Sequence, residues 1–131
     1  MLEGGCYCRQ VRYQVEGPTT HVAVCHCSDC RRHAGAPMVT WAAVKADQLD
    51  FTGEVATFAS SEHGRRQFCA TCGTGLFYMN DVALPGLVDI QTGTLDDPEA
   101  MPPGAQIQAA ERLEWINRIG ELPAFERYPG P

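Results

Sequence analysis

The sequence predicts a mainly β fold, built from short antiparallel strands joined by tight turns and short helical turns. Apolar residues recur at every second position or in short runs, as they do in half-buried strands. Thirteen glycines and nine prolines in 131 residues supply turns and leave little room for long helices. No repeat, low-complexity run or linker divides the chain, so we expect a single domain over residues 1–131.

Seven segments fit the strand pattern, and turn dipeptides such as Gly-Pro and Pro-Gly separate them. The predicted strands are residues 11–16, 20–24, 38–44, 48–51, 55–59, 75–78 and 87–92. One short helix is predicted over 28–33, with Ser28 as its N-cap. A further strand or turn is expected at 107–109, a helix at 111–119, and a tail from residue 121 that lies on the surface.

Composition argues against two classes of function. A formal net charge of −6 does not suit a general nucleic-acid binder, which needs an extended basic face. Two arginine pairs, at 31–32 and 65–66, form small basic spots suited to a small anion. No segment approaches the ~18 apolar residues that span a bilayer, and the opening MLEGGCYC lacks the apolar core of a signal peptide. We therefore expect a cytoplasmic protein with reduced thiols and with no nucleic-acid or membrane partner.

Seven cysteines fall into three groups, spaced C-x-C, C-x-C-x-x-C and C-x-x-C. The groups are Cys6/Cys8, Cys25/Cys27/Cys30 and Cys69/Cys72. The odd number and the small ring that a C-x-C bridge would close both argue against a disulfide scaffold, so the clustered thiols predict metal binding. Gly73 follows the last cysteine, and a glycine there permits the positive φ of a tight knuckle at a hairpin tip.

Seven ligands divide most simply into a four-cysteine site and a three-cysteine site. The first and third groups supply two pairs that close a tetrahedron, as in a structural zinc site. The middle group then forms a site whose fourth position stays open for water or substrate. A rival division joins the two C-x-x-C spacings into a zinc ribbon, and His26 or His33 could close the three-cysteine site. Spacing alone leaves these alternatives open.

Three thiolates on Zn²⁺ leave a net charge of −1, which makes the ion a weak Lewis acid suited to soft ligands. Such a site captures an incoming thiol as a thiolate, ready to attack an aldehyde. We therefore predict that Cys25, Cys27 and Cys30 are catalytic. Residues near the basic spots would bind the anionic part of the substrate; they are Arg31, Arg65 and Ser60. A zinc module that binds a protein partner without catalysis is the alternative, and a redox sensor with free thiols is a third reading.

Several segments resemble one family along nearly the whole chain. They are GGCYCRQVRY, VCHCSDCRRHAGAP, FASSEHGRRQFCATCGTGLFY and the tail EWINRIGELPAFERY. In order and spacing they resemble the glutathione-dependent formaldehyde-activating enzyme family, which includes centromere protein V. Two positions depart from the family pattern: Arg9 stands where glycine is usual, and Gln106 stands where histidine is frequent.

The resemblance implies a β-tent fold of twisted antiparallel sheets and a single zinc-binding domain of this family's type. It also implies two zinc ions per chain, a structural one at the four-cysteine site and a catalytic one at the three-cysteine site. The founding activity joins glutathione to formaldehyde to give S-hydroxymethylglutathione, and in reverse it is a carbon–sulfur lyase. The expected partners are therefore a small thiol such as glutathione and an aldehyde, or their adduct.

Overall fold

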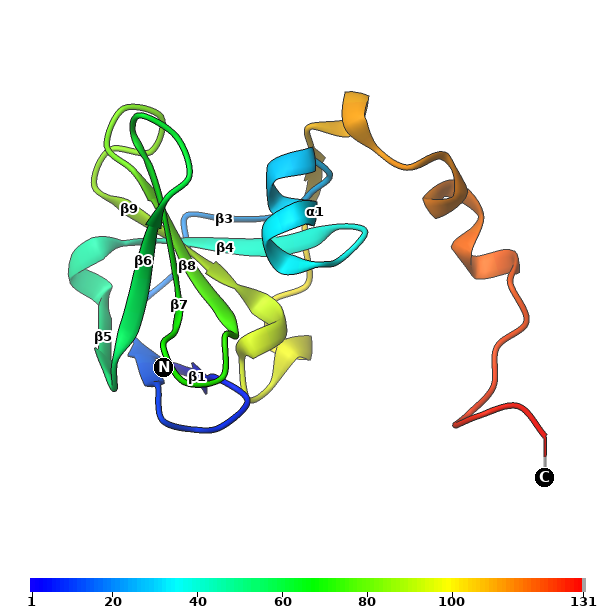
Figure 1. Ribbon diagram of the computed structural model, residues 1–131, viewed down its shortest axis with the longest axis horizontal. Coiled ribbons are helices and arrows are strands. Elements are labelled where there is room, and N and C mark those ends of the chain that lie inside the picture. Colours follow the sequence, from blue (N-terminus) through cyan, green and yellow to red (C-terminus); the bar gives the residue numbers. More distant parts are fainter. Residues whose placement is uncertain (131) are drawn as a thin grey trace.

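Two β-sheets form the body of the protein (Figure 1). The computed structural model describes residues 1–130, and within them ten strands are present. The smaller sheet is antiparallel and has the order β1 (Leu2–Gly5), β2 (Arg12–Val15), β5 (Leu49–Thr52). The larger sheet has the order β10 (Ala105–Ile107), β3 (His21–Cys25), β4 (Val39–Lys45), β9 (Leu87–Gln91), β8 (Gly75–Asn80), β7 (Gly64–Cys69), β6 (Val55–Ala59).

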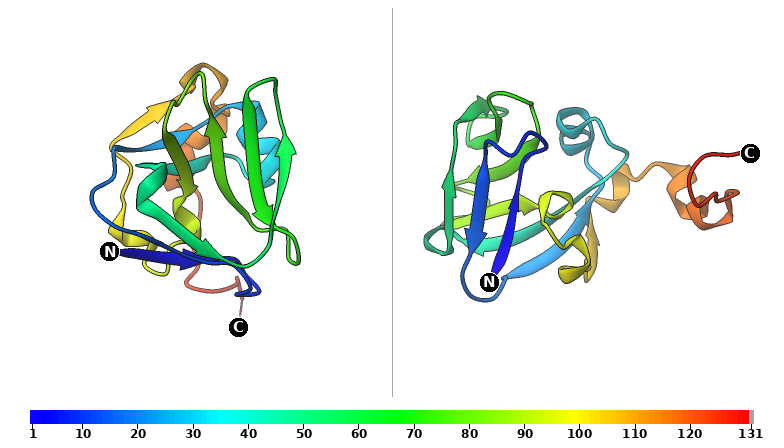
Figure 2. Two further views of the ribbon diagram at one scale, coloured as in Figure 1. Left: turned by 90° about the vertical axis from the view of Figure 1, so that its left-hand side faces the viewer. Right: turned by 90° about the horizontal axis from the view of Figure 1, so that it is seen from below.

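All strand pairs in the described chain are antiparallel except β10, which runs parallel to β3. The two sheets lean against each other, with the smaller one crossing the end of the larger (Figure 2). The predicted mainly β, β-tent fold of twisted antiparallel sheets is therefore confirmed, with one parallel pair added at an edge.

Side-chain alternation on the larger sheet builds two apolar layers. On β4, Val44 is fully buried and packs between the two sheets, where Tyr13 and Phe77 also meet with ring centroids 5.5 Å apart. Trp41 lies an odd number of residues away and therefore faces the other side of the sheet. There it packs with Cys25 and its neighbours under the single α-helix of the described chain. The strand period thus places the three-cysteine group and the main core on opposite faces.

The helix α1 (Ser28–Ala34) confirms the predicted segment, but its N-cap is Cys27 rather than Ser28. The Cys27 sulfur accepts a hydrogen bond from the backbone N–H of Cys30 at 3.3 Å, so a thiol takes the place of the expected hydroxyl. Gly35 ends the helix with a φ of 65°, a left-handed conformation that glycine adopts without steric cost. The cap therefore ties two cysteines of one group into a single turn.

The remaining differences are at β7 (Gly64–Cys69), which was not among the predicted strands, in the short helical turns and at the ends of the chain. The glycine-rich β1 was not predicted, because its pairing with β2 is a tertiary contact and its sequence, LEGG, has low strand propensity. Short 3₁₀ turns join the strands, namely η1 (Ala46–Gln48), η2 (Thr92–Thr94), η3 (Pro98–Ala100) and η4 (Ala109–Glu111). The predicted helix at 111–119 is the 3₁₀ segment η5 (Glu114–Glu121).

The C-terminal tail does not lie on the surface as predicted but runs away from the body (Figure 1). Its large apolar side chains are exposed, from Trp115 at 45% to Tyr128 at 89%. No helix within residues 1–130 is long and apolar enough to cross a membrane.

Candidate metal centres

Four cysteines from two distant segments meet at the edge of the main core. Their sulfur atoms lie within 4.8 Å of one another, and the residues are Cys6, Cys8, Cys69 and Cys72. The first pair comes from the loop between β1 and β2; in the second pair Cys69 ends β7 and Cys72 lies in the turn before β8. Gly73 has the predicted positive φ, 81°, so the knuckle forms as its sequence indicated.

Backbone N–H groups point at these sulfurs. Val11 donates to the Cys6 sulfur at 3.2 Å, and the knuckle N–H groups donate to the Cys69 sulfur at 3.4 Å. The hydroxyl and N–H of Thr74 lower the pKa of Cys72 to about 5. Donors of this kind favour the thiolate, which is the form that binds a metal.

The spacing of the sulfurs fits a tetrahedral metal ion. The Cys6–Cys8 and Cys8–Cys69 sulfur pairs are 3.5 and 3.7 Å apart. A zinc–sulfur bond of about 2.3 Å in a tetrahedron places sulfurs roughly 3.8 Å apart. The donor set and its geometry therefore suit zinc, with all four positions taken by the protein.

The second cluster holds three cysteines around the start of α1. Cys25 ends β3, Cys27 caps the helix and Cys30 lies in its first turn, and the three sulfurs lie within 4.8 Å of one another. Neither His26 nor His33 joins this cluster. The His26 ring is fully buried and bonds through Nε2 to Gln106 Oε1 at 2.8 Å, whereas the His33 ring packs edge-on against Phe68. The cluster thus offers three ligand atoms.

Burial makes full ionisation of these three thiols costly without a cation. Burial raises the pKa of the Cys25 thiol to about 12 and raises that of Cys30. Burial also opposes ionisation of Cys27, but the N–H of Cys30, the neighbouring Cys30 and Cys25 thiols and the charge of Arg66 together outweigh it and lower the Cys27 pKa. A divalent cation would compensate three adjacent thiolates, so this donor set also suits zinc.

Arg66 on β7 is the guanidinium that reaches the second cluster. Its two Nη atoms each lie 3.7 Å from the Cys30 sulfur, and the group stacks 4.7 Å from the centroid of the Tyr78 ring. The side chain is only 5% exposed, and no carboxylate in the described chain pairs with it. Because a buried charge needs a counter-charge, the contact indicates that the cluster is anionic in the folded protein.

A pocket of about 270 Å³ opens beside the second cluster. Helix α1 forms one wall and the β6–β7 hairpin the other, and the lining residues are Asp29, Arg32, His33, Phe58, Ser60 and Arg66. Burial lowers the pKa of His33, with the charge of Arg66 adding to the effect. The pocket therefore combines two guanidiniums, a neutral imidazole and an aromatic ring next to the cysteines.

Of the three predicted substrate-binding residues, the structure places one in the lining of the pocket. Ser60 lines the pocket. Arg31 instead donates through Nη1 to the carbonyl oxygens of His26 and Glu111, at 2.8 and 2.6 Å. Arg65 donates to backbone carbonyls of the β6–β7 turn, including that of Gly64 at 2.8 Å. The substrate roles of these three residues stay predictions, and the arginines that line the pocket are their neighbours in sequence.

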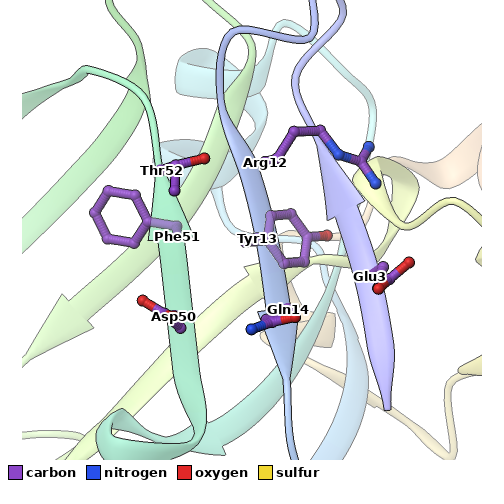
Figure 3. A pocket seen from close by; sticks show the side chains of 7 residues that line it. All are labelled: Glu3, Arg12, Tyr13, Gln14, Asp50, Phe51 and Thr52. Carbon is purple, nitrogen blue, oxygen red and sulfur yellow. The ribbon is translucent and has the colours of Figure 1, made fainter.

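Another hollow of similar volume, about 270 Å³, lies over the smaller sheet (Figure 3). Its described lining holds acidic, amide and hydroxyl groups but no cysteine. The guanidinium of Arg12 at its rim already forms a two-point ion pair with Asp96. We therefore place the functional site at the cysteines and not here.

The fold and the two cysteine clusters define a β-sheet protein with two candidate metal sites, one offering four ligand atoms and the other three. Comparison with known proteins supplies the family. The sequence model described as glutathione-dependent formaldehyde-activating enzyme matches residues 1–111, so the chain belongs to this family. The match ends near the point where the tail leaves the body.

Individual relatives are distant. An uncharacterized lyase of Schizosaccharomyces pombe is 28% identical over 76 residues, which span 58% of this chain and little more than half, 56%, of the yeast protein. A Halomonas elongata protein, named provisionally as a glutathione-dependent formaldehyde-activating enzyme, is 25% identical over 88% of this chain and 80% of its own. The crystal structure of a Rhodobacter sphaeroides protein has a TM-score of 0.64 at 20% identity, covering 79% of this chain and 98% of that one. This last likeness supports the fold alone.

Proposed function

We propose that the chain, as one domain over residues 1–131, is a zinc-dependent carbon–sulfur lyase that acts on thiol–aldehyde adducts such as S-hydroxymethylglutathione. One observation carries the proposal: the second cluster offers three ligand atoms, not four, and the Arg66 that contacts Cys30 also lines a pocket. Family membership supports the same reaction class, as do the names of two relatives, one called a lyase and the other a putative glutathione-dependent formaldehyde-activating enzyme. The four-cysteine site would hold a structural zinc and the three-cysteine site a catalytic one.

The residues around the second cluster have distinct roles in this proposal. Zinc held by Cys25, Cys27 and Cys30 would supply Lewis acidity that favours the thiolate form of a substrate sulfur at neutral pH. Arg66 offsets the negative charge of the three protein thiolates. Arg32 and Ser60 would bind a substrate carboxylate, because both line the pocket and can donate hydrogen bonds.

The lyase reaction also needs a proton acceptor. The carbon–sulfur bond breaks with its electron pair leaving on sulfur, the hydroxyl oxygen becomes the aldehyde oxygen, and the hydroxyl proton must be removed. His33 lines the pocket and its pKa is lowered by burial, so at neutral pH its imidazole is unprotonated and able to accept that proton.

Metal content and turnover test the proposal together. Protein purified without chelator should contain about two zinc ions per chain by elemental analysis. Exchange NMR with glutathione and formaldehyde should show adduct formation and breakdown faster than the uncatalysed reaction. Cys27→Ser should keep the fold and lower this rate by more than about 100-fold, because it removes a ligand of the open site. Unchanged turnover in that variant would sink the proposal.

The alternative is a zinc module without catalysis. It predicts a second metal that exchanges slowly and no acceleration of the adduct reaction with any small thiol or aldehyde. The three-ligand cluster and its pocket favour the enzyme, because a closed structural site uses four protein ligands.

A further inference from the structure

The C-terminal tail carries an unpartnered apolar stripe. Five large side chains follow one another at intervals of four, three, three and three residues, the first two in the 3₁₀ segment η5 and the other three in the irregular chain after it. They are Trp115, Ile119, Leu122, Phe125 and Tyr128, exposed by 45, 50, 56, 57 and 89%. Since monomeric proteins rarely leave so many neighbouring large apolar side chains in water, this set, called the apolar stripe below, indicates a partner surface.

The root of the tail is fixed to the body, and this sets its direction. Arg31 donates to the carbonyl oxygen of Glu111 at 2.6 Å, and the Ser28 N–H donates to the Glu111 carboxylate at 3.2 Å. Arg112 donates to Gln106 at 3.2 Å. Beyond that point, no hydrogen bond joins residues 113–130 to the rest of the described chain. The tail is therefore held at its base and directed away from its own body (Figure 1).

The area of the stripe indicates which partner fits. Large apolar side chains bury about 150–250 Å² each, so five side chains at these exposures present roughly 500 Å². One tail covered by an unrelated protein would bury about 1,000 Å² in total, which is below the roughly 1,200 Å² of stable specific interfaces. Two tails exchanged reciprocally would bury about 2,000 Å², within the usual range. In a two-fold symmetric dimer the same contact occurs twice, so the buried area doubles without a second kind of interface.

We propose that the tail is an exchange arm, with which two copies of this chain form a symmetric dimer by each laying residues 113–130 on the body of the other. The apolar stripe is the face that becomes buried. The proposal goes beyond the lyase function and does not depend on it.

Sedimentation velocity of the full zinc-loaded chain from 0.1 to 100 μM tests this directly. The wild-type chain should be a dimer at micromolar concentration. Ile119→Ser and Leu122→Ser should each raise the dimer dissociation constant by at least about 30-fold, as loss of a central apolar contact does. Asn117→Ser is the matched control, because Asn117 is exposed in the same segment but is not one of the five apolar side chains, so its loss should leave the constant unchanged.

Tryptophan fluorescence reports where the tail lies. The chain has two tryptophans, and Trp41 is buried at 4% exposure, so Trp115→Phe leaves only a shielded emitter. The difference between wild type and this variant isolates Trp115. In the dimer Trp115 should be protected from iodide, and on dilution to monomer it should become accessible.

Three results would overturn the proposal. The chain could stay monomeric up to 100 μM, it could form a dimer that the tail substitutions do not weaken, or Trp115 could stay protected in the monomer. The last result would mean that the tail folds back on its own body. Lyase activity enters none of these readouts, so failure of the exchange arm leaves the proposed reaction untouched.

Discussion

At the scale of single residues, one step along β7 decides which arginine meets the cysteines. Successive side chains of a strand point to opposite faces of the sheet. Arg66 pairs with Tyr78 across the ladder and turns toward Cys30, whereas Arg65 pairs with Met79 and stays exposed. The sequence showed an arginine pair but not the register, so it identified the basic spot and selected Arg65. A signal was present in the alternation of β7: Arg66 lies an odd number of residues before Cys69 and is therefore on the opposite face from that ligand of the four-cysteine site, whereas Arg65 shares its face.

Arg66→Met should weaken zinc binding at the three-cysteine site by about 10- to 100-fold, the usual cost of losing a group that supports metal ligands. The buried thiolates would lose the cation that contacts Cys30 through both Nη atoms. Competition with a chromophoric chelator measures this affinity without any activity assay. Arg66→Lys retains the charge and should keep most of the affinity. Equal affinities in wild type and Arg66→Met would show that the arginine does not compensate the cluster.

Arg9 occupies a left-handed conformation with a φ of 69°, at the position where the resembled family usually has glycine. Such a conformation costs a non-glycine residue on the order of 1 kcal/mol. Arg9→Gly should therefore raise the free energy of unfolding by up to about 1 kcal/mol, less the entropy that glycine adds to the unfolded chain. Denaturant melts of the zinc-loaded protein measure the change. Arg9→Ala keeps Cβ and should give no such gain; a gain from both would point to charge rather than backbone strain.

At the scale of elements, local patterns predicted what depends on local chemistry. The helix at 28–33, the knuckle with Gly73 and most strands appeared where expected, since alternation and turn residues specify them. β1 and the parallel edge strand β10 form only because a neighbouring strand supplies backbone hydrogen-bond partners for them. The tail was misjudged for a related reason: its apolar residues indicate burial, but not against which molecule.

Asp89 is an exception to the apolar pattern of the buried strands, because it places a carboxylate on β9, between β4 and β8. It is 9% exposed, its Oδ1 lacks a hydrogen-bond partner, and burial raises its pKa above the ordinary 3.8 despite the nearby His21. The folded state therefore binds more protons than the unfolded state between these two pKa values, and stability falls as pH rises through that window.

Asp89→Asn removes this titration and should be more stable than wild type at pH 7 by on the order of 1 kcal/mol. The difference should shrink as the pH falls and level off below 3.8, where the wild-type carboxyl is protonated in both states. Urea melts of both proteins across this pH range measure it. Asp50→Asn, at an exposed position of β5, is the control and should change little. A pH-independent difference would contradict the burial argument.

At the scale of the whole molecule, the two cysteine sites differ in what they hold together. The four-cysteine site joins the first ten residues to the β7–β8 turn, and two of its cysteines belong to the main core. The three-cysteine site is local to β3 and α1, within six residues of chain. The spacing of the cysteines favoured this division into four and three ligands but left other divisions open. Only the fold brings residues 6–8 beside residues 69–72. The two walls of the pocket come from segments some thirty residues apart, so the spacing of residues in the sequence could not predict the pocket either.

This difference predicts unequal responses to ligand loss. Cys72→Ser should leave the chain unfolded or aggregated, because a structural zinc contributes about 10 kcal/mol or more to folding and typical domains have only 5–15 kcal/mol in total. Cys27→Ser should keep the far-UV spectrum and a cooperative melt, since β3 and α1 remain packed on Trp41. A chelator titration of wild type followed by circular dichroism should accordingly release one zinc with the fold intact and the second together with unfolding. Release of both ions without loss of structure would mean that the four-cysteine site does not hold the two sheets together.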